Sequence, residues 1–365
     1  MKFIDATGSY ETWLASSLAA PLVPSDLEHK HRLLADAKNP FPFFRGSYYR
    51  WAQHWEKSDL TDAPRVMSIG DLHIANFGTW RDAEGRLCWG VNDFDEADEL
   101  PYTNDLVRLA ASVRFAKKAG VIRVKFSDAC DAILDGYRQA FAEGGLPFIL
   151  EEHHPHLRAL AMRADRDPVA FWTKMSRLLV DPPIEAPPEV RSLLEAAFPV
   201  PELSPQIRAR GQAGVGSLGR PRFVALASWK GGWICREAKA AAPPATAWLR
   251  NEMSGCRSGE ALARAIRSPD PFYRPCDRWI LRRLGPRSSR IELEQLQFVD
   301  LIRILRAMAS ETANVHLGTP GAAEAIAADL NHRPKDWLLD GARRLTAELE
   351  QDWLEWRGLY APKRR

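Results

Sequence analysis

The chain has 365 residues, of which 45% are hydrophobic and 27% charged, and its formal net charge is only +3. A chain of this length and composition can bury a large core, so it needs neither disulfides nor a structural metal to fold. The near-balanced charge by itself neither favours nor excludes nucleic acid, and no other feature of the sequence predicts a nucleic-acid partner.

Cysteine usage and hydropathy indicate where the protein works. The five cysteines, at positions 88, 130, 235, 256 and 276, form no C-x-x-C pair, which favours reduced thiols in a cytoplasmic protein. Residues 1–30 are too polar for a signal peptide. No apolar run approaches the ~20 residues needed to cross a bilayer. We therefore expect a soluble cytoplasmic protein without a membrane partner.

Hydrophobic periodicity, together with the positions of Pro and Gly, divides the chain into five segments. Residues 1–65 are predicted to be helical and then irregular. Residues 66–165 should begin with a strand at "RVMSIGD" and a hairpin at "GTWRDAEGRLCWGVNDF", followed by helices that end at glycines. The repeated prolines of residues 166–205 predict a connecting segment.

The remaining two segments complete the predicted fold. Residues 206–294 should form strands at "RFVALASW", "WICREA", "DRWILRRL" and "SRIEL", with short helices between them. Residues 295–365 are predicted to be almost entirely helical. Separate helical and antiparallel segments of this kind predict an α+β fold.

Two acidic stretches carry the strongest chemical signal. "SIGDLHIANFG" (residues 68–78) places Asp71 and Asn76 five residues apart after a predicted strand. The hairpin then returns the chain to "NDFDE", so that Asp93 can lie beside Asn76. Phosphoryl transfer needs a carboxylate that orients the attacking hydroxyl and oxygen ligands for Mg²⁺. Asp71, Asn76 and Asp93 supply these groups, and Asp95 is a further candidate metal ligand.

Other interpretations of these acidic residues remain open at this stage. The first is an acidic turn without a metal, held by a capping Asp. The second is a metal-dependent hydrolase that uses Asp71, His73, Asp93 and Asp95.

The stretch "GVGSLG" places Gly214, Gly216 and Gly219 in a G-x-G-x-x-G pattern that also contains Ser217. A dinucleotide-binding fold would continue into a helix. Here "RPRFVALASW" follows, which is typical of a strand. This favours a loop that covers nucleotide phosphates with backbone N–H groups. A plain Gly turn in a hairpin remains the alternative.

Four further residues are candidates for a role beside these loops. The strands after "GVGSLG" resemble those of kinases, whose second strand carries a lysine for the nucleotide phosphates, and this resemblance implies that role for Arg236 in "WICREA", or for Lys239 if the strand ends at Glu237. Asp105 is either an ordinary first-turn residue of a helix or, as a resemblance to phosphotransferases implies, a brace for the Asp71 loop. Arg45 is either a structural arginine or a phosphate contact.

"GDLHIAN" resembles the catalytic loop of aminoglycoside phosphotransferases and choline kinases and, more distantly, of protein kinases. "NDFDE" is similar to their Asp-Phe-Gly element. The resemblance implies that Asp71 orients or deprotonates an acceptor hydroxyl, and that Asn76 and Asp93 hold Mg²⁺ with ATP. It departs from the family pattern at Ile69, where protein kinases often have His, and at Arg236, where they have Lys.

The order of these motifs is unusual for a kinase. Here the glycine loop follows the catalytic loop by over a hundred residues, and "LQFVDLIRILRAMASETANVHLG" near the C-terminus resembles the helix that ordinarily precedes the catalytic loop. This order resembles a two-lobed kinase-like fold that has been circularly permuted, which compact domains tolerate because their termini are often close together.

The motif set as a whole is similar to an uncharacterised bacterial domain-of-unknown-function family. The resemblance implies an ATP- and Mg²⁺-dependent phosphotransferase whose expected acceptor is a small molecule with a hydroxyl group. A protein acceptor, a nucleotide-binding pseudokinase or scaffold, and a nucleotidyl transferase to protein are the alternatives within this fold.

Overall fold

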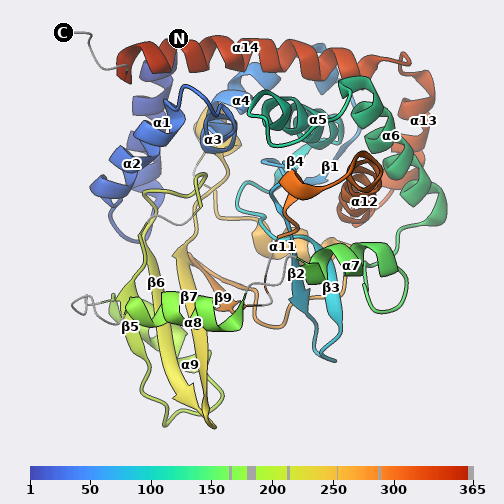
Figure 1. Ribbon diagram of the computed structural model, residues 1–365. Coiled ribbons are helices and arrows are strands. Elements are labelled where there is room, and N and C mark those ends of the chain that lie inside the picture. Colours follow the sequence, from blue (N-terminus) through green and yellow to red (C-terminus); the bar gives the residue numbers. More distant parts are fainter. Residues whose placement is uncertain are drawn as a thin grey trace.

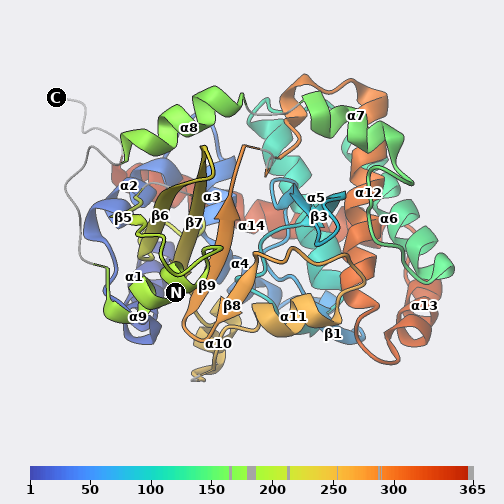
Figure 2. The same ribbon diagram turned by 90° about the horizontal axis from the view of Figure 1, so that it is seen from below.

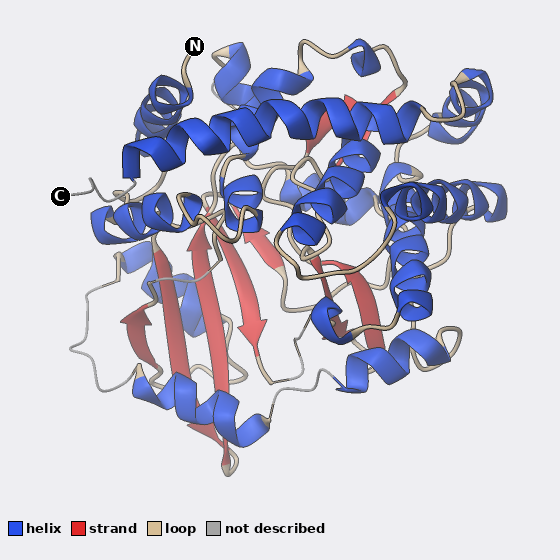
Figure 3. Ribbon diagram, turned by 45° about the horizontal axis from the view of Figure 1, so that its top comes forward, coloured by secondary structure: helices blue, strands red, loops and turns tan. Residues whose placement is uncertain are grey.

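The computed structural model of the chain describes residues 1–163, 167–178, 186–211, 214–252, 254–286, 288 and 290–360. The chain combines many helices with strands that pair only in antiparallel fashion, which fits the predicted α+β class (Figure 1, Figure 3). A helical part lies opposite a five-stranded sheet in Figure 1. Within the described residues, no helix is both long and apolar enough to traverse a bilayer.

The N-terminal segment forms four short helices, and the last helix of the chain lies across them (Figure 1). The rings of Phe3 and Trp356 are 5.2 Å apart, and Arg50 Nε donates to Asp352 Oδ2 at 2.8 Å. The two ends of the described chain therefore lie side by side. These helices are α1 (Phe3–Ser17), α2 (Pro24–Leu34), α3 (Phe41–Gly46), α4 (Tyr48–Trp55) and α14 (Trp337–Tyr360).

Two short antiparallel strand pairs come next. β1 (Arg65–Ser68) pairs with β4 (Asp98–Pro101), and β2 (Phe77–Arg81) pairs with β3 (Leu87–Val91). The second pair is the predicted hairpin, and Gly85 adopts the left-handed φ of 77° in its turn.

Helices pack behind these strands and form the main hydrophobic core. Gly120 follows the helix that ends at Lys118, and Gly144 follows the helix that ends at Glu143. Both glycines have left-handed φ values, 74° and 77°, as predicted from the sequence. The helices of this part are α5 (Thr103–Lys118), α6 (Phe126–Glu143), α7 (Pro155–Arg163), α12 (Phe298–His316) and α13 (Ala322–His332).

Glu311 on α12 is a buried carboxyl that packs against the hairpin. Its Oε1 accepts a hydrogen bond from the Val91 amide at 3.2 Å, and its Oε2 accepts one from Asn314 at 3.1 Å. A Cβ at Gly90 would lie 2.2 Å from Glu311 Oε1, so only glycine leaves room for this carboxyl. Burial raises the pKa of Glu311 to about 7, although Arg267 acts in the opposite direction.

We expect Glu311→Gln to remove a pH dependence of stability. A carboxyl whose pKa is raised on folding stabilises the protein below its unfolded pKa and loses that contribution as the pH rises through 7. The variant should therefore be more stable than the wild type at pH 8, by on the order of 2 kcal/mol, and close to it at pH 5. Denaturant unfolding at both pH values measures this difference. The exposed Glu324→Gln is the control, and an unchanged pH slope in Glu311→Gln would contradict the assignment.

The large sheet is entirely antiparallel, with strand order β5-β6-β7-β9-β8. The turn between its two longest strands contains Lys230 and Gly231 with φ values of 47° and 84°, a combination that suits a two-residue hairpin. The strands are β5 (Gln206–Ala209), β6 (Arg222–Trp229), β7 (Gly232–Ala240), β8 (Arg274–Cys276) and β9 (Trp279–Leu284).

The strand predicted at "SRIEL" is absent from its described residues. Ile291 and Leu293 are buried and Glu292 is exposed, so the residues alternate as in a strand. However, this segment pairs with no strand there and continues into a 3₁₀ turn, Leu293–Gln295. The alternation arises because Ile291 and Leu293 pack into the hydrophobic core, and not because the segment is a strand of the sheet.

In its described part, the Pro-rich connecting segment contains two helices. Pro168 and Pro188 occupy the first turns of α8 (Pro168–Arg177) and α9 (Pro188–Ala196), where the missing N–H costs nothing. The two helices cover opposite faces of the sheet (Figure 2). The apolar contacts of α8 are made by Phe171 and Met175 with Val224, Leu226 and Cys235. Pro182 and Pro183 lie outside the described residues.

Two short helices, α10 (Ala245–Arg250) and α11 (Ser258–Arg264), connect β7 to β8. They confirm the helical segment predicted between the strands.

Candidate active site

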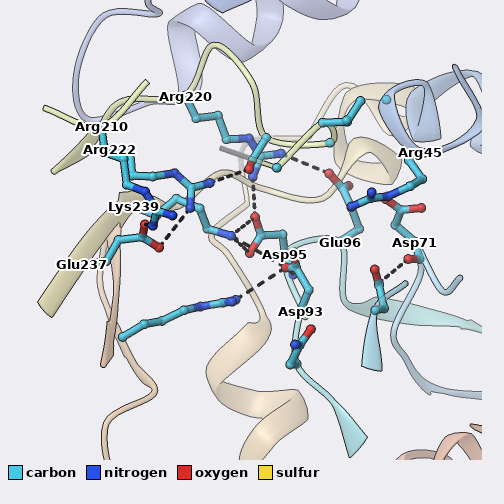
Figure 4. A pocket seen from close by; sticks show the side chains of 18 of the residues that line it. Arg45, Asp71, Asp93, Asp95, Glu96, Arg210, Arg220, Arg222, Glu237 and Lys239 are labelled. Atoms are coloured by element: carbon cyan, nitrogen blue, oxygen red, sulfur yellow. Dashed lines mark hydrogen bonds and ion pairs between the residues drawn. The ribbon is translucent and has the colours of Figure 1, made fainter. Parts of the chain in front are cut away.

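A cavity of about 710 Å³ lies where the glycine loop and the sheet face the two acidic loops (Figure 4). Most of the residues predicted to form a site line it. They are Asp71, Asn76, Asp93, Asp95, Gly214, Gly216, Ser217 and Lys239. Gly219 and Arg236, which were also predicted, are not part of its described lining.

The Asp71 loop is held by buried hydrogen bonds to its backbone. The carboxylate of Asp105 accepts from the amides of Ile69 at 2.7 Å and Gly70 at 3.0 Å. Nε2 of His316, at the end of α12, lies 3.0 Å from Asp105 Oδ2. Asp105 therefore braces the loop, which decides between the two interpretations that the sequence left open.

Gly70 allows the chain to turn just before Asp71. Its φ is +79°, and an added Cβ would lie 2.2 Å from the carbonyl oxygen of Glu96 and 2.9 Å from the Tyr48 hydroxyl. No other residue type combines this left-handed backbone with such a close approach.

We expect Gly70→Ala to lower the free energy of unfolding by on the order of 3 kcal/mol, because the variant adds overlap with backbone to left-handed strain. Gly85→Ala is a matched control. Its φ is +77°, and nothing lies within 4 Å of an added Cβ. It should cost only about 1 kcal/mol. Chemical denaturation measures both, and equal losses would show that the contact with Glu96 is unimportant.

Asp71 presents one carboxylate oxygen to an internal arginine. Its Oδ1 accepts from Arg108 Nε at 2.8 Å and from Arg108 Nη2. Oδ2 lies 3.8 Å from the Cβ position of Gly216 in the glycine loop. Burial raises the pKa of Asp71 to about 6, although Arg108 acts in the opposite direction. The carboxyl can therefore exchange a proton close to neutral pH.

Asn76 and Asp93 are brought together by the hairpin. Asn76 Nδ2 donates to the Asp71 carbonyl at 2.7 Å, and the Asn92 amide donates to the Asn76 carbonyl at 2.8 Å. Asp93 Oδ1 lies 3.7 Å from Lys239 Nζ and 3.7 Å from Arg282 Nη2. Burial alone would raise the pKa of Asp93. Lys239 and Arg282 lower the pKa by a larger amount, so the net shift is downward and the carboxylate stays charged.

Asp95 is bound by cations (Figure 4). Its oxygens accept from Lys239 Nζ at 2.7 and 2.6 Å, and Oδ2 also accepts from Arg220 Nη1 at 3.1 Å. Arg220 also binds Glu96, because its Nη2 donates to Glu96 Oε1 at 3.1 Å. Both oxygens of Asp95 therefore hold cations in this structure, and Asp95 connects Lys239 and Arg220 at the cavity wall.

The prediction that Arg236 reaches the site is wrong. Side chains on a strand alternate between its faces, so residues three apart point in opposite directions. Lys239 faces the cavity, whereas Arg236 lies on the other face of β7. There its Nε donates to the Ala197 carbonyl at 3.0 Å, and its guanidinium is 4.6 Å from the Phe272 ring centroid.

The glycine loop joins β5 to β6 and reaches over the Asp71 loop. A Cβ at Gly216 would lie 3.3 Å from the Arg45 carbonyl, and Ser217 Oγ accepts from Arg222 at 2.7 Å. Gly219 differs from the prediction. Its φ is +95°, and its Cβ position is 2.5 Å from Leu27 Cδ2. Gly219 therefore anchors the loop to α2 instead of facing the cavity.

Several charged residues of the cavity wall had been given no role. Arg222, Glu237 and Arg282 share the Lys239 face of the sheet, which strand alternation alone would have indicated. Two residues that were named from the sequence, Arg45 and His73, also line the cavity, and Arg45 Nε lies 3.3 Å from His73 Nε2. Lys30 on α2 also lines it, and nothing in its local sequence marks it.

Fold and site together define an α+β protein in which two acidic loops and a glycine loop enclose one charged cavity. Residues 22–147 match the model of a family described as "Uncharacterized protein conserved in bacteria (DUF2252)". The match supports the expected relationship to an uncharacterised bacterial family. It includes both acidic loops and ends before the glycine loop. No curated protein and no solved structure gives a significant match.

Proposed function

We propose that the protein is an ATP- and Mg²⁺-dependent phosphotransferase that acts on a hydroxyl group. One observation carries the proposal: Asp71, Asn76, Asp93, the glycine loop and Lys239 all face a single cavity. Phosphoryl transfer needs positioning and charge stabilisation more than covalent chemistry. The cavity also falls within the range of about 300–1,000 Å³ that small-molecule ligands occupy.

Each residue has a role in this proposal that follows from its chemistry. The backbone of Gly214 and Gly216 covers the nucleotide phosphates, and Lys239 supplies a positive charge beside them. Asp71, with its raised pKa, orients the acceptor hydroxyl and accepts its proton.

The residues present fit a magnesium ion. The amide NH₂ of Asn76 is engaged by the Asp71 carbonyl, so its amide oxygen is the group able to coordinate a cation. Asp93 is charged and its side chain is 39% exposed. Mg²⁺ is usually held by one or two carboxylates together with phosphate oxygens and water. When bound with ATP, it supplies charge neutralisation on the phosphates.

The position of α12 supports a circularly permuted, two-lobed kinase-like arrangement. This helix comes late in the chain, yet its end meets the start of the Asp71 loop. His316 reaches Asp105, and Thr319 Oγ1 accepts from the Met67 amide at 2.9 Å. The adjacent ends of α1 and α14 are compatible with such a rearrangement.

The geometry weakens two of the alternatives. A pseudokinase is suggested by an arginine, Arg236, at the position where kinases have lysine. Because Lys239 lines the cavity and Arg236 does not, the cavity has a lysine after all. A metal-dependent hydrolase would need a cluster of ligands. However, no group of three or more His, Cys, Asp or Glu in the described part of the chain is arranged to hold a metal. In addition, Arg108 engages Asp71, and Lys239 engages Asp95.

Transfer of radioactive label tests the proposal. Protein, Mg²⁺ and a metabolite extract are incubated with γ-labelled or α-labelled ATP. The γ label should enter a small molecule in an Asp71-dependent manner. Entry of the α label into protein would instead establish nucleotidyl transfer. ATP binding without any turnover would establish a pseudokinase. A thermal-shift screen of nucleotides with Mg²⁺ and Mn²⁺ identifies the nucleotide beforehand.

A further inference from the structure

A buried lysine in the cavity wall takes no part in the roles assigned above. Lys30 lies on α2 and is only 4% exposed, yet it lines the cavity. Its Cε is 3.5 Å from the Cβ position of Gly46, which is itself 3.2 Å from Val215 in the glycine loop. The end of the Lys30 side chain therefore lies beside the glycine loop.

The Lys30 ammonium has no hydrogen-bond or ion-pair partner among the described residues. Lys239 is equally buried, at 2%, but binds Asp95 at 2.6 Å. The carboxylates of Glu11, Glu96 and Asp71 attract Lys30 only at longer range. Each is held by a closer cation or imidazole, since Glu11 lies 2.7 Å from His31, Glu96 pairs with Arg220 and Asp71 with Arg108. Because an ammonium on a buried side chain is costly without a close counter-charge, Lys30 needs a reason to be where it is.

The charge of the whole cavity supplies that reason. Among the described residues that line it, nine are lysine or arginine and five are aspartate or glutamate. Carboxylates of the cavity already form ion pairs with arginines. Arg108 pairs with Asp71, and Arg222 Nη1 lies 3.0 Å from Glu237 Oε1. Positive charge therefore remains in excess on the walls, and it is complementary to an anionic ligand.

We propose that Lys30 forms an anion subsite beside the glycine loop, which takes a phosphate or carboxylate group close to Asp71. The proposed phosphotransfer offers two sources for this anion: the terminal phosphate of the nucleotide, or an anionic group carried by the acceptor. Only the choice between these sources rests on that function. The subsite itself rests on the burial and the missing partner of Lys30.

The test compares wild type with Lys30→Met, which keeps the length of the side chain and removes its charge. The ligand-free variant should melt about 2–5 °C higher, since it no longer buries an unpaired ammonium. Its affinity for pyrophosphate should fall at least tenfold. The exposed Lys38→Met is the control and should change neither property. If Lys30→Met does not fold, Lys30→Gln replaces it, with the same expectation for pyrophosphate.

Four probes identify the source of the anion: inorganic phosphate, pyrophosphate, ADP and the β,γ-imido analogue of ATP. Weaker binding of the ATP analogue with ADP unchanged assigns Lys30 to the terminal phosphate. Weaker binding of inorganic phosphate or pyrophosphate to the ADP-saturated protein, with both nucleotides unchanged, assigns it to an anionic acceptor.

Other outcomes separate this inference from the proposed function. Affinities for all four probes that match the wild type would overturn the subsite, as would a lower melting temperature without any loss of anion affinity. Pyrophosphate binding that depends on Lys30, in a protein that binds no nucleotide, would sustain the subsite and reject the phosphotransferase.

Discussion

Replacing Asp71 by asparagine is expected to lower the rate of phosphoryl transfer by about 10³-fold, which is typical for the loss of a general base. Asparagine still offers an oxygen to Arg108, but the buried guanidinium loses its counter-charge. The melting temperature should therefore fall, and the rates are compared at a temperature at which both proteins are folded. The initial rate of label transfer from γ-labelled ATP measures the effect. Asp340→Asn, on an exposed part of α14, is the control. Equal rates in wild type and Asp71→Asn would exclude a catalytic role for Asp71.

The pH profile gives Asp71 a second and independent signature. Because burial raises its pKa to about 6, the carboxylate that accepts the proton disappears as the pH falls below 6. The activity of the wild type should therefore decline on the acid side with a midpoint near pH 6. The residual activity of Asp71→Asn should lack this decline. If the acid limb persists in the variant, another group is responsible for it.

Lys239→Met is expected to weaken ATP binding by about 10–100-fold, because it removes a charge-assisted contact to phosphate. Arg220 still pairs with Asp95 at 3.1 Å, so the acidic loop keeps a cation. Calorimetric titration with ATP and Mg²⁺ measures the affinity, and the melting temperature of the free protein checks that the fold is intact.

Arg236→Met is the matched control for Lys239→Met, because it removes a cation from the same strand on the opposite face. It should leave the affinity for ATP within about twofold of wild type, because its partners, the Ala197 carbonyl and the Phe272 ring, lie on the other face of β7 and outside the described lining of the cavity. Arg236 is buried, so the melting temperature of the variant checks that the fold is intact. The reverse pattern, with binding lost in Arg236→Met and kept in Lys239→Met, would show that Arg236 binds ATP. It would also show that the cavity described above is not the ATP site.

Local elements were predictable because their causes are local. The hairpin around Gly85 and the helices that end at Gly120 and Gly144 follow from glycine in left-handed turns and from hydrophobic periodicity. The strand predicted at "SRIEL" failed because apolar alternation also occurs in an extended segment that anchors to the core. Only the presence of a partner strand separates the two cases.

The error at Arg236 has an equally physical origin. A motif fixes the approximate position of a cation along the chain, but the face of the sheet depends on the pairing of β7 with β6 and β9. A shift of one residue in register reverses every side chain. The ion pairs of Asp95 could not be predicted for a related reason, since its partners Lys239 and Arg220 lie over a hundred residues away in the sequence.

By itself, the sequence determined the α+β class, the two acidic loops, and the strand that follows the glycine loop, because short-range spacing and turn chemistry are sufficient for these. The tertiary structure alone decided that Lys239 and not Arg236 faces the cavity, and that Asp105 and His316 brace the Asp71 loop. It also decided that Lys30 is buried without a partner in the described part of the chain. These properties depend on long-range packing, which sets the burial and charge around each group and which no local pattern records.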